Sequence, residues 1–306
     1  MSLKVAVIVA SVDRGVDSSA RLAHFAAEVA DRGEILVMDS TPDGCGIGSA
    51  RGLRNVRVLR KPLGMLAPEL WRDGLDATCT PLVAFSTTAM MPEPGWLDAM
   101  IGRLEETGAA GVGGPIVPAD GLNPTERAIY LLRYIRYYNP LCFQGDAEPP
   151  GDNALYRRES LQNVRKLINR GFWEVEIHHA LRRRGARFEM TGEGRLLYQG
   201  GGRLSSTINQ RLRHATAYGA SRAPGMSTTE RVARTAAAPL VLFVLMRRIA
   251  SVLKAQGIAR EPWLPALPSL ALLATAWAAG EAAGIWTGVE RSSRNAPLVN
   301  PRPEIV

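Results

Sequence analysis

The chain has 306 residues, which is enough for one large α/β domain with an appended segment. Its net charge of +8 at pH 7 comes largely from arginines, which are concentrated after residue 150. That charge is compatible with solvated helix faces, or with a partner that bears phosphates, either a nucleotide diphosphate or anionic lipid headgroups. Nucleic acid is not expected, because the sequence shows no interleaving of aromatic and basic residues and no known binding motif.

The three cysteines, Cys45, Cys79 and Cys142, share no metal-ligand spacing and form no even set. This usage favours reduced thiols in a cytoplasmic protein.

The amino-terminal half alternates short apolar runs with stretches of helical periodicity. The run over 4–10 (KVAVIVA) is nearly continuous and β-branched, which is typical of a strand buried on both faces. Strands are predicted over 4–10, 34–38, 56–59 and 81–85, and helices over 18–32, 68–77 and 94–107. Strands that alternate with helices in this way predict an α/β fold whose mostly parallel sheet is flanked by helices.

The strand over 81–85 is expected to stop abruptly at Ser86-Thr87-Thr88. Its last residues then lie at the edge of the sheet, which is where open α/β sheets bind ligands. A strand end of this kind often carries carboxylates that hold a metal. This one carries hydroxyls, followed by Ala89 and two methionines.

After residue 120 the pattern loosens. A long helix is predicted around 125–138, a loop rich in proline and glycine follows it, and another helix is predicted at about 174–184. Beyond Pro224 there are two apolar segments, 236–246 and 264–280. Each is shorter than the twenty or so residues that span a bilayer.

Basic residues lie between these two segments, namely Arg247, Arg248, Lys254 and Arg260. Together they predict a helical pair that lies in or dips into a membrane surface. The alternative is a buried helical hairpin of the soluble domain. We therefore expect a first domain over 1–223 and a helical, membrane-associated segment and tail over 224–306.

Residues 39–52 (DSTPDGCGIGSARG) suggest a dinucleotide-binding loop at first sight. The spacing excludes it, because Ser49 stands where the third glycine of that motif is required. The glycines are better explained by a mobile loop.

Six segments occur in one order along the chain: the strand over 4–10, VMDSTPDG at 37–44, the stretch over 81–97 that ends in PEPGWL, GVGGP at 111–115, GDNALYRRESL at 151–161, and GFWEVEIHHALRRRG at 171–185. Together they resemble family 2 glycosyltransferases of the GT-A (nucleotide-diphospho-sugar transferase-like) fold, over roughly residues 4–220.

The resemblance implies an inverting transfer of a sugar from a nucleotide-sugar donor to a hydroxyl. The acceptor is expected to be a lipid-linked or envelope polysaccharide, at the cytoplasmic face of the cell membrane. A C-terminal helical segment for membrane association also agrees with this resemblance.

The donor is expected to bind at strand ends, where Ser11 follows the first strand. Asp39 matches the family's aspartate after the second strand, which binds the uracil or ribose, and a carboxylate can accept hydrogen bonds from either. Asp43 is a second candidate for that role, and an Asx-turn is the structural alternative. Asp152 and Asn153 are expected to contact the donor sugar or acceptor, unless they merely shape their turn.

Thr87-Thr88-Ala89 stands where the family's acidic residues coordinate a divalent cation, Mg²⁺ or Mn²⁺. Hydroxyls are poor ligands for such a cation without carboxylate support. Three interpretations follow: transfer without a metal, a metal held by other residues, or a catalytically inactive relative. In transfer without a metal, Thr87 and Thr88 only donate hydrogen bonds to the diphosphate.

Positive charge for the leaving diphosphate would then come from QRLRHATAYG at 210–219. This stretch resembles the Q-x-x-R-W box of membrane-associated members of the family, with His214 in place of the tryptophan. Arg211, Arg213 and His214 are expected to neutralise the diphosphate through charge-assisted hydrogen bonds. The alternative is an ordinary basic helix face.

Alignment on GFWEVEIHHALRRRG puts Glu174 at the position of the general base that deprotonates the acceptor hydroxyl. Apolar Trp173 beside it is expected to raise the pKa of Glu174 toward working pH. Glu176 is a second candidate, and His178 lies one helical turn from Glu174, at a spacing that allows a hydrogen bond or a shared metal. Intact Glu174 favours an enzyme, whereas the missing acids favour a non-catalytic binding or assembly subunit.

Overall fold

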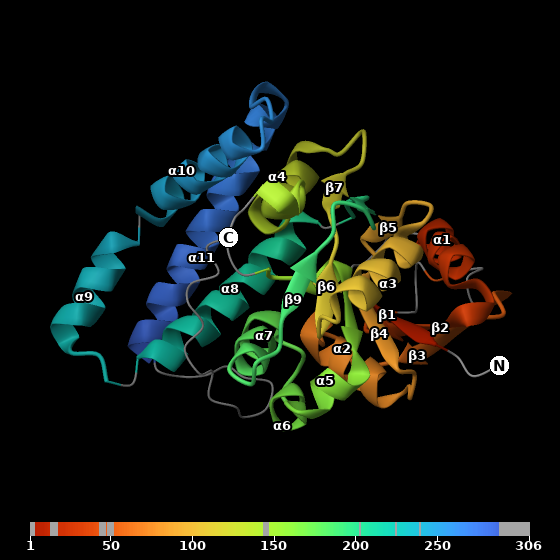
Figure 1. Ribbon diagram of the computed structural model, residues 1–306. Coiled ribbons are helices and arrows are strands. Elements are labelled where there is room, and N and C mark those ends of the chain that lie inside the picture. The colour runs from red at the N-terminus through yellow and green to blue at the C-terminus, as the bar shows by residue number, and fades with distance from the viewer. Residues whose placement is uncertain are drawn as a thin grey trace. The chain divides into compact units, whose positions relative to one another are not determined.

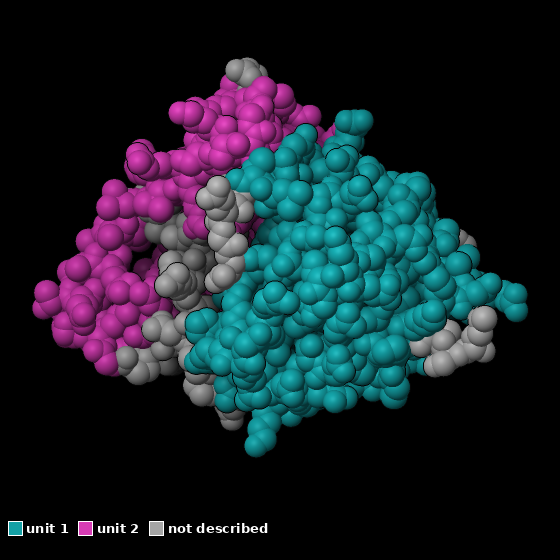
Figure 2. All heavy atoms as spheres, viewed as in Figure 1, with its two compact units in different colours: residues 1–120, 137–201 teal, residues 121–136, 202–306 magenta. Residues whose placement is uncertain are grey.

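The computed structural model describes residues 4–12, 18–42, 47, 52–142, 147–201, 203–223, 225–238 and 240–287. The chain divides into two compact units, coloured separately in Figure 2. Unit 1 comprises residues 1–120 and 137–201, and unit 2 comprises residues 121–136 and 202–306. Helix α8 (Leu204–Arg222), which precedes the domain boundary expected at 223, belongs to unit 2. Asp43 lies outside the described residues.

Unit 1 is built on a seven-stranded sheet with the order β3-β2-β1-β4-β8-β6-β9 (Figure 1). Its strands are β1 (Val5–Ser11), β2 (Gly33–Asp39), β3 (Val56–Arg60), β4 (Leu82–Thr87), β6 (Gly111–Gly113), β8 (Ala154–Arg157) and β9 (Phe188–Met190). Strand β8 is antiparallel to both neighbours, and the other pairs are parallel. The predicted mostly parallel sheet is therefore confirmed.

A second, three-stranded sheet lies alongside in the same unit, with the order β5-β10-β7. It joins β5 (Met90–Pro92), β10 (Leu196–Tyr198) and β7 (Ile116–Pro118). Strand β5 follows directly after the turn at the end of β4, so this small sheet fixes the chain that leaves the candidate site.

Helices cover both faces of the large sheet. One face is covered by α2 (Ala67–Asp76), α5 (Arg158–Gln162), α6 (Arg165–Ile168) and α7 (Glu174–Arg182). The core there contains a cluster of aromatic rings, in which the centroids of Phe85 and Phe172 are 4.4 Å apart. Helices α1 (Ser19–Val29) and α3 (Trp96–Thr107) pack on the other face, where Phe25 meets the Trp96 ring edge-on at 5.4 Å.

Several predicted elements of the first 140 residues end elsewhere in the structure, β4 and α4 among them. Strand β4 extends through Ser86 and Thr87, because its parallel pairing with β1 continues to the pair Ala10–Thr87. The helix expected over 125–138 is α4 (Pro124–Arg133), which is followed by a separate 3₁₀ turn at Ile135–Tyr137.

The helices of unit 2 are α4, α8, α9 (Thr228–Ala237), α10 (Leu240–Ala255) and α11 (Leu267–Thr287), with a 3₁₀ segment at Glu261–Ala266 before α11. Glycines bring α8 and α11 into backbone contact. A Cβ at Gly284 would overlap the carbonyl oxygen of Thr216, and one at Gly219 would overlap that of Glu281. Small residues permit this close approach, as they do between helices in membranes.

The two predicted apolar segments differ from the helices that contain them. The first is interrupted, because α9 ends at Ala237 and α10 begins at Leu240, directly after Pro239, and a proline disfavours helix in the residue before it. The second was expected to be too short to span a bilayer. The continuous helical stretch Pro262–Thr287 has 26 residues and is long and apolar enough, although 39% of its most apolar stretch is buried. Length and composition alone do not separate a membrane span from a core helix.

Candidate active site

Three parallel strands end together at one edge of the large sheet. Ser11 pairs with Asp39 across β1 and β2, and Ala10 pairs with Thr87 across β1 and β4. The backbone N–H of Thr88 donates to the carbonyl of Ala10 at 3.0 Å, which continues the ladder past the end of β4. Three of the predicted donor-binding residues, Ser11, Asp39 and Thr87, therefore lie at neighbouring strand ends, and all three are buried.

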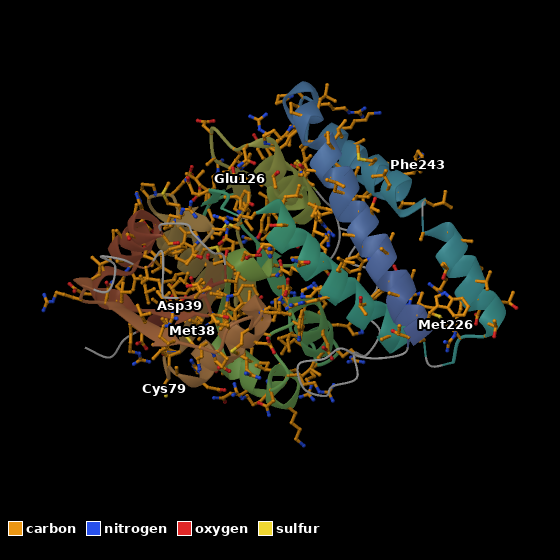
Figure 3. The ribbon with its side chains drawn as sticks, turned by 180° about the vertical axis from the view of Figure 1, so that it is seen from behind. Met38, Asp39, Cys79, Glu126, Met226 and Phe243 are labelled. Atoms are coloured by element: carbon orange, nitrogen blue, oxygen red, sulfur yellow. The ribbon has the colours of Figure 1, made fainter. Side chains whose placement is uncertain are left out.

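Asp39 ends β2, next to Met38 in Figure 3, and its carboxylate is fully buried. Its Oδ1 accepts hydrogen bonds from the backbone N–H and the hydroxyl of Thr41, at 3.0 and 2.7 Å. Its Oδ2 forms an ion pair with Arg60, the last residue of β3. The contact with the Thr41 N–H is that of an Asx-turn. The role of Asp39 in binding a nucleotide stays a prediction, and Arg60 is a neighbour that the sequence did not indicate.

The end of β4 presents two buried hydroxyls. Within the described part of the chain, the Oγ of Ser86 and the Oγ1 of Thr87 have no hydrogen-bond partner. A buried hydroxyl without a partner is costly, and such groups mark places where a ligand or water completes the bonding. The Thr87 hydroxyl is therefore available to a ligand or to water.

Arg21, from the first turn of α1, reaches the same turn. Its Nη1 donates to the carbonyl oxygen of Thr88 at 2.8 Å, and its guanidinium also contacts the carbonyl oxygens of Gln199 and Gly200 at 3.4 to 3.5 Å. A permanent positive charge is thus held beside the turn at residues 87–89. The sequence did not indicate this contact, because three strands separate Arg21 from the turn and no motif includes it.

Glu174 approaches this edge from α7. It is the first residue of that helix, where a carboxylate is favoured by the helix dipole, and it is half-buried. Its carboxyl carbon lies 3.1 Å from where a Cβ at Gly151 would stand, and the ring of Trp71 lies 2.8 Å from the same point. The Trp71 Nε1–H in turn donates to the carbonyl of Ser86 at 2.8 Å. Through these contacts the predicted base is connected with the end of β4.

Strand β8 runs opposite to its neighbours, so its start lies at the edge where β4 ends. The residues before it, Gly151, Asp152 and Asn153, form a buried 3₁₀ turn there. The Asn153 side chain accepts from the Trp96 Nε1–H at 2.8 Å and donates to the carbonyls of Pro115 and Gly194. These bonds give Asn153 a role in joining three segments of the fold, and its contact with a donor stays a prediction, as does that of Asp152.

His178 is buried on the inner side of α7, where its Nε2 is 2.7 Å from the hydroxyl of Tyr156. Burial, with a further contribution from the charge of Arg182, lowers the pKa of His178 to about 3, so the imidazole is neutral near pH 7. Burial also raises the pKa of Tyr156 well above its usual value, and the charge of Glu174 adds to this.

Burial raises the pKa of Glu176, and the charge of Arg170 lowers it by a smaller amount. Glu176 therefore stays a second candidate base.

No known protein family matches this sequence, and no curated protein matches it. Among solved structures, the chain is similar to the mannosyltransferase PcManGT from Pyrobaculum calidifontis, solved in complex with GDP-Man and Mn²⁺. The match has a TM-score of 0.53 at 15% sequence identity, and it covers 91% of this chain and 86% of that chain. The fold is glycosyltransferase-like. At this identity the similarity concerns the fold alone.

A divalent cation is the group that the resemblance to family 2 glycosyltransferases implies, and the side chains that the structure describes at this edge do not fit it. Thr87 and Thr88 offer only hydroxyls, and Ala89 only a methyl group, at the turn where carboxylates are needed. Among the described residues there is also no group of three His, Cys, Asp or Glu side chains placed to hold a metal ion, and the spacing of Glu174 and His178 does not create one.

The basic residues predicted to meet the diphosphate lie on α8 in unit 2. The Arg211 guanidinium stacks on the Trp277 ring at 5.2 Å, and Arg213 is exposed. Burial, with further contributions from the charges of Arg211 and Arg133, lowers the pKa of His214 to about 4. His214 is therefore neutral near pH 7, and the positive charge of this stretch is that of Arg211 and Arg213. Their contact with a diphosphate stays a prediction.

Proposed function

We propose that this protein is a glycosyltransferase that moves a sugar from a nucleotide-sugar donor to a hydroxyl, with inversion. The observation that carries the proposal is the meeting of strand ends at one edge of a glycosyltransferase-like fold. There the buried Thr87 hydroxyl lacks a partner within the described chain, and the Trp71 and Gly151 contacts connect that edge with Glu174.

In this proposal Glu174 is the general base. Its carboxylate accepts the proton of the acceptor hydroxyl as that oxygen attacks the anomeric carbon. A new C–O bond forms on one face of the sugar while the bond to the diphosphate oxygen breaks on the other, and this inverts the configuration. Thr87 and Thr88 donate hydrogen bonds to the diphosphate, and arginine guanidinium groups neutralise the negative charge of the leaving group.

Arg21 donates a hydrogen bond to the carbonyl oxygen of Thr88, which makes it the first candidate for this charge. Arg211 and Arg213 are the further candidates carried over from the resemblance. A guanidinium is charged at every relevant pH and donates along two parallel bonds, which suits a phosphate oxygen pair.

The acceptor that we propose is a lipid-linked or envelope polysaccharide at the cytoplasmic face of the cell membrane. Support comes from unit 2, where large apolar side chains are exposed on helix α10. Phe243, labelled in Figure 3, is 70% exposed, and Leu240 and Val244 are exposed as well. Arg247 and Arg248 follow on the same helix. An apolar face with neighbouring cations is the composition that binds anionic lipid surfaces.

A non-catalytic binding or assembly subunit is the second candidate function. The observation that favours it is the state of Asp39, whose two carboxylate oxygens are already occupied by Thr41 and Arg60. The absence of carboxylates at residues 87–89 points the same way.

A screen of donor hydrolysis and donor binding across nucleotide sugars distinguishes the glycosyltransferase from the non-catalytic subunit. Full-length protein is assayed with and without a chelator, and Glu174→Gln is compared with Glu176→Gln as the matched control. If Glu174 is the base, Glu174→Gln keeps donor binding and loses turnover by roughly 10²- to 10⁴-fold, the usual contribution of general-base catalysis. Donor binding without turnover by wild-type protein, or no binding of any nucleotide sugar with or without metal, would favour the assembly subunit over the transferase.

A further inference from the structure

A pocket of ≈ 520 Å³ lies at the edge of the large sheet opposite the candidate active site. It is formed where β6 begins, where β8 ends and where β9 begins, all within unit 1. Its volume lies within the range of about 300–1,000 Å³ that small-molecule sites occupy. Its polar lining comprises Arg157, Glu159, Ser160, Asn163, Arg184 and Arg187.

The lining is strongly cationic, with three guanidinium groups against the one carboxylate of Glu159. Within the described residues, no ion pair engages Arg157, Arg184 or Arg187, which leaves their charges available to a ligand. Elsewhere in unit 1 the arginines are commonly paired, as in Arg103 with Glu189 and Arg182 with Glu148. Like charges that share a small volume repel each other unless an anion lies between them.

Two of the three guanidinium groups are held in place by the backbone. Arg157 donates from Nε to the carbonyl of Ala109 at 3.1 Å and from Nη2 to the carbonyl of Leu104 at 3.0 Å. Arg184 donates from Nη1 to the carbonyl of Asn163. The two bonds of Arg157 also occupy carbonyls near the end of α3, so the negative end of that helix is covered. Each arginine keeps further N–H groups, and a preorganised guanidinium loses less entropy when an anion binds.

We propose that this pocket binds a small, soluble molecule that carries a phosphate. Guanidinium groups pair with phosphate oxygens through two parallel hydrogen bonds, and the Ser160 hydroxyl and Asn163 amide supply neutral polar contacts. A lipid headgroup is the other source of phosphate. It is less suited, because none of the exposed large apolar residues of unit 1 (Leu63, Tyr138 and Leu141) lines the pocket to anchor an acyl chain.

The test uses full-length protein and inorganic pyrophosphate as the probe, with binding measured by calorimetry at low salt. The double variant Arg184→Gln/Arg187→Gln removes two charges from the pocket. Its matched control, Lys166→Gln/Arg183→Gln, removes two exposed charges nearby that do not line it. All four residues are exposed. Thermal melts followed by circular dichroism check that both doubles stay folded.

We expect the pocket double variant to bind pyrophosphate at least tenfold more weakly, since each lost charged hydrogen bond usually costs roughly that factor or more. The control double should change binding less than threefold. Equal losses in the two doubles, or no binding by wild-type protein, would each overturn the proposal.

A second arm distinguishes the soluble ligand from a lipid. Cosedimentation with vesicles that contain phosphatidic acid should be the same for wild-type protein and the pocket double variant. A loss of cosedimentation confined to the pocket variant would assign the pocket to a lipid headgroup and refute the soluble ligand. None of these measurements depends on sugar transfer, so they stand or fall separately from the proposed function.

Discussion

Substituting alanine for Gly151 perturbs the contact between the predicted base and the sheet edge. A Cβ at this position would stand 2.8 Å from the Trp71 ring and 3.1 Å from the Glu174 carboxyl carbon. Carbon atoms attract each other best at about 3.5–4.0 Å, so both neighbours are too close. The two neighbours differ in their freedom to move.

Trp71 has little freedom, because it is 2% exposed and its Nε1–H is bonded to the Ser86 carbonyl. Glu174 is half-buried at the first turn of its helix and can give way more easily. Inserting a methyl group into a packed site of this kind usually costs about 1–3 kcal/mol. We therefore expect Gly151→Ala to lower the free energy of unfolding of unit 1 by about that amount and to displace the Glu174 carboxylate.

Urea unfolding followed by tryptophan fluorescence measures the loss. Gly102→Ala is the matched control, since Gly102 lies inside α3 with no atom within 4 Å of its would-be Cβ. Alanine is favoured over glycine in a helix by roughly 0.5–1 kcal/mol, so the control should stabilise. If Gly151→Ala unfolds at the wild-type midpoint, the close packing of Trp71, Gly151 and Glu174 is wrong. The connection of the base with the strand ends would then be lost as well.

Three further outcomes are expected. Asn153→Ala should destabilise by roughly 2–5 kcal/mol in urea unfolding, because it leaves the Trp96 N–H and two buried carbonyls without partners, and a loss below 1 kcal/mol would contradict a structural role. Because the pKa of His178 falls from 6.5 to about 3 on folding, the unfolded chain binds more protons between these values, and stability should drop by about 2 kcal/mol from pH 7 to pH 5. His178→Asn should flatten that slope, and an unchanged slope would show that other groups cause it. Arg21→Gln should weaken binding of a nucleoside diphosphate by roughly 10- to 100-fold and leave nucleoside binding unaltered, whereas equal effects on both would remove Arg21 from the diphosphate.

Local patterns predicted the sheet and its strand ends well. The apolar runs before Ser11, Asp39 and Thr87 are long enough to identify buried strands, and parallel pairing then brings their ends to one edge without further information. The helix that begins at Glu174 was predicted within two residues at its end, because its periodicity is clear.

What the sequence did not show depends on contacts between distant residues. The antiparallel direction of β8 is set by its pairing with β4 and β6, and its four residues carry no signal of direction. The bonds of Arg21 to Thr88 and of Arg60 to Asp39 join residues that no short motif connects. The arginine pocket is likewise assembled from three separate segments, so it was not predicted at all.

The backbone contact between α8 and α11 also affects the order in which the two units fold while the chain is synthesised. Helix α8 leaves the ribosome well before its partner, and at about 5–20 residues per second the wait for the end of α11 is roughly 3 to 13 s. During this interval the face of α8 around Gly219 is not yet covered by Gly280 and Gly284 of α11. Unit 2 can therefore complete its fold only after synthesis of its last helix, whereas every strand of unit 1 has already emerged by then. A released chain that is truncated near residue 225 should thus be protected from proteases in its sheet and cut within α8.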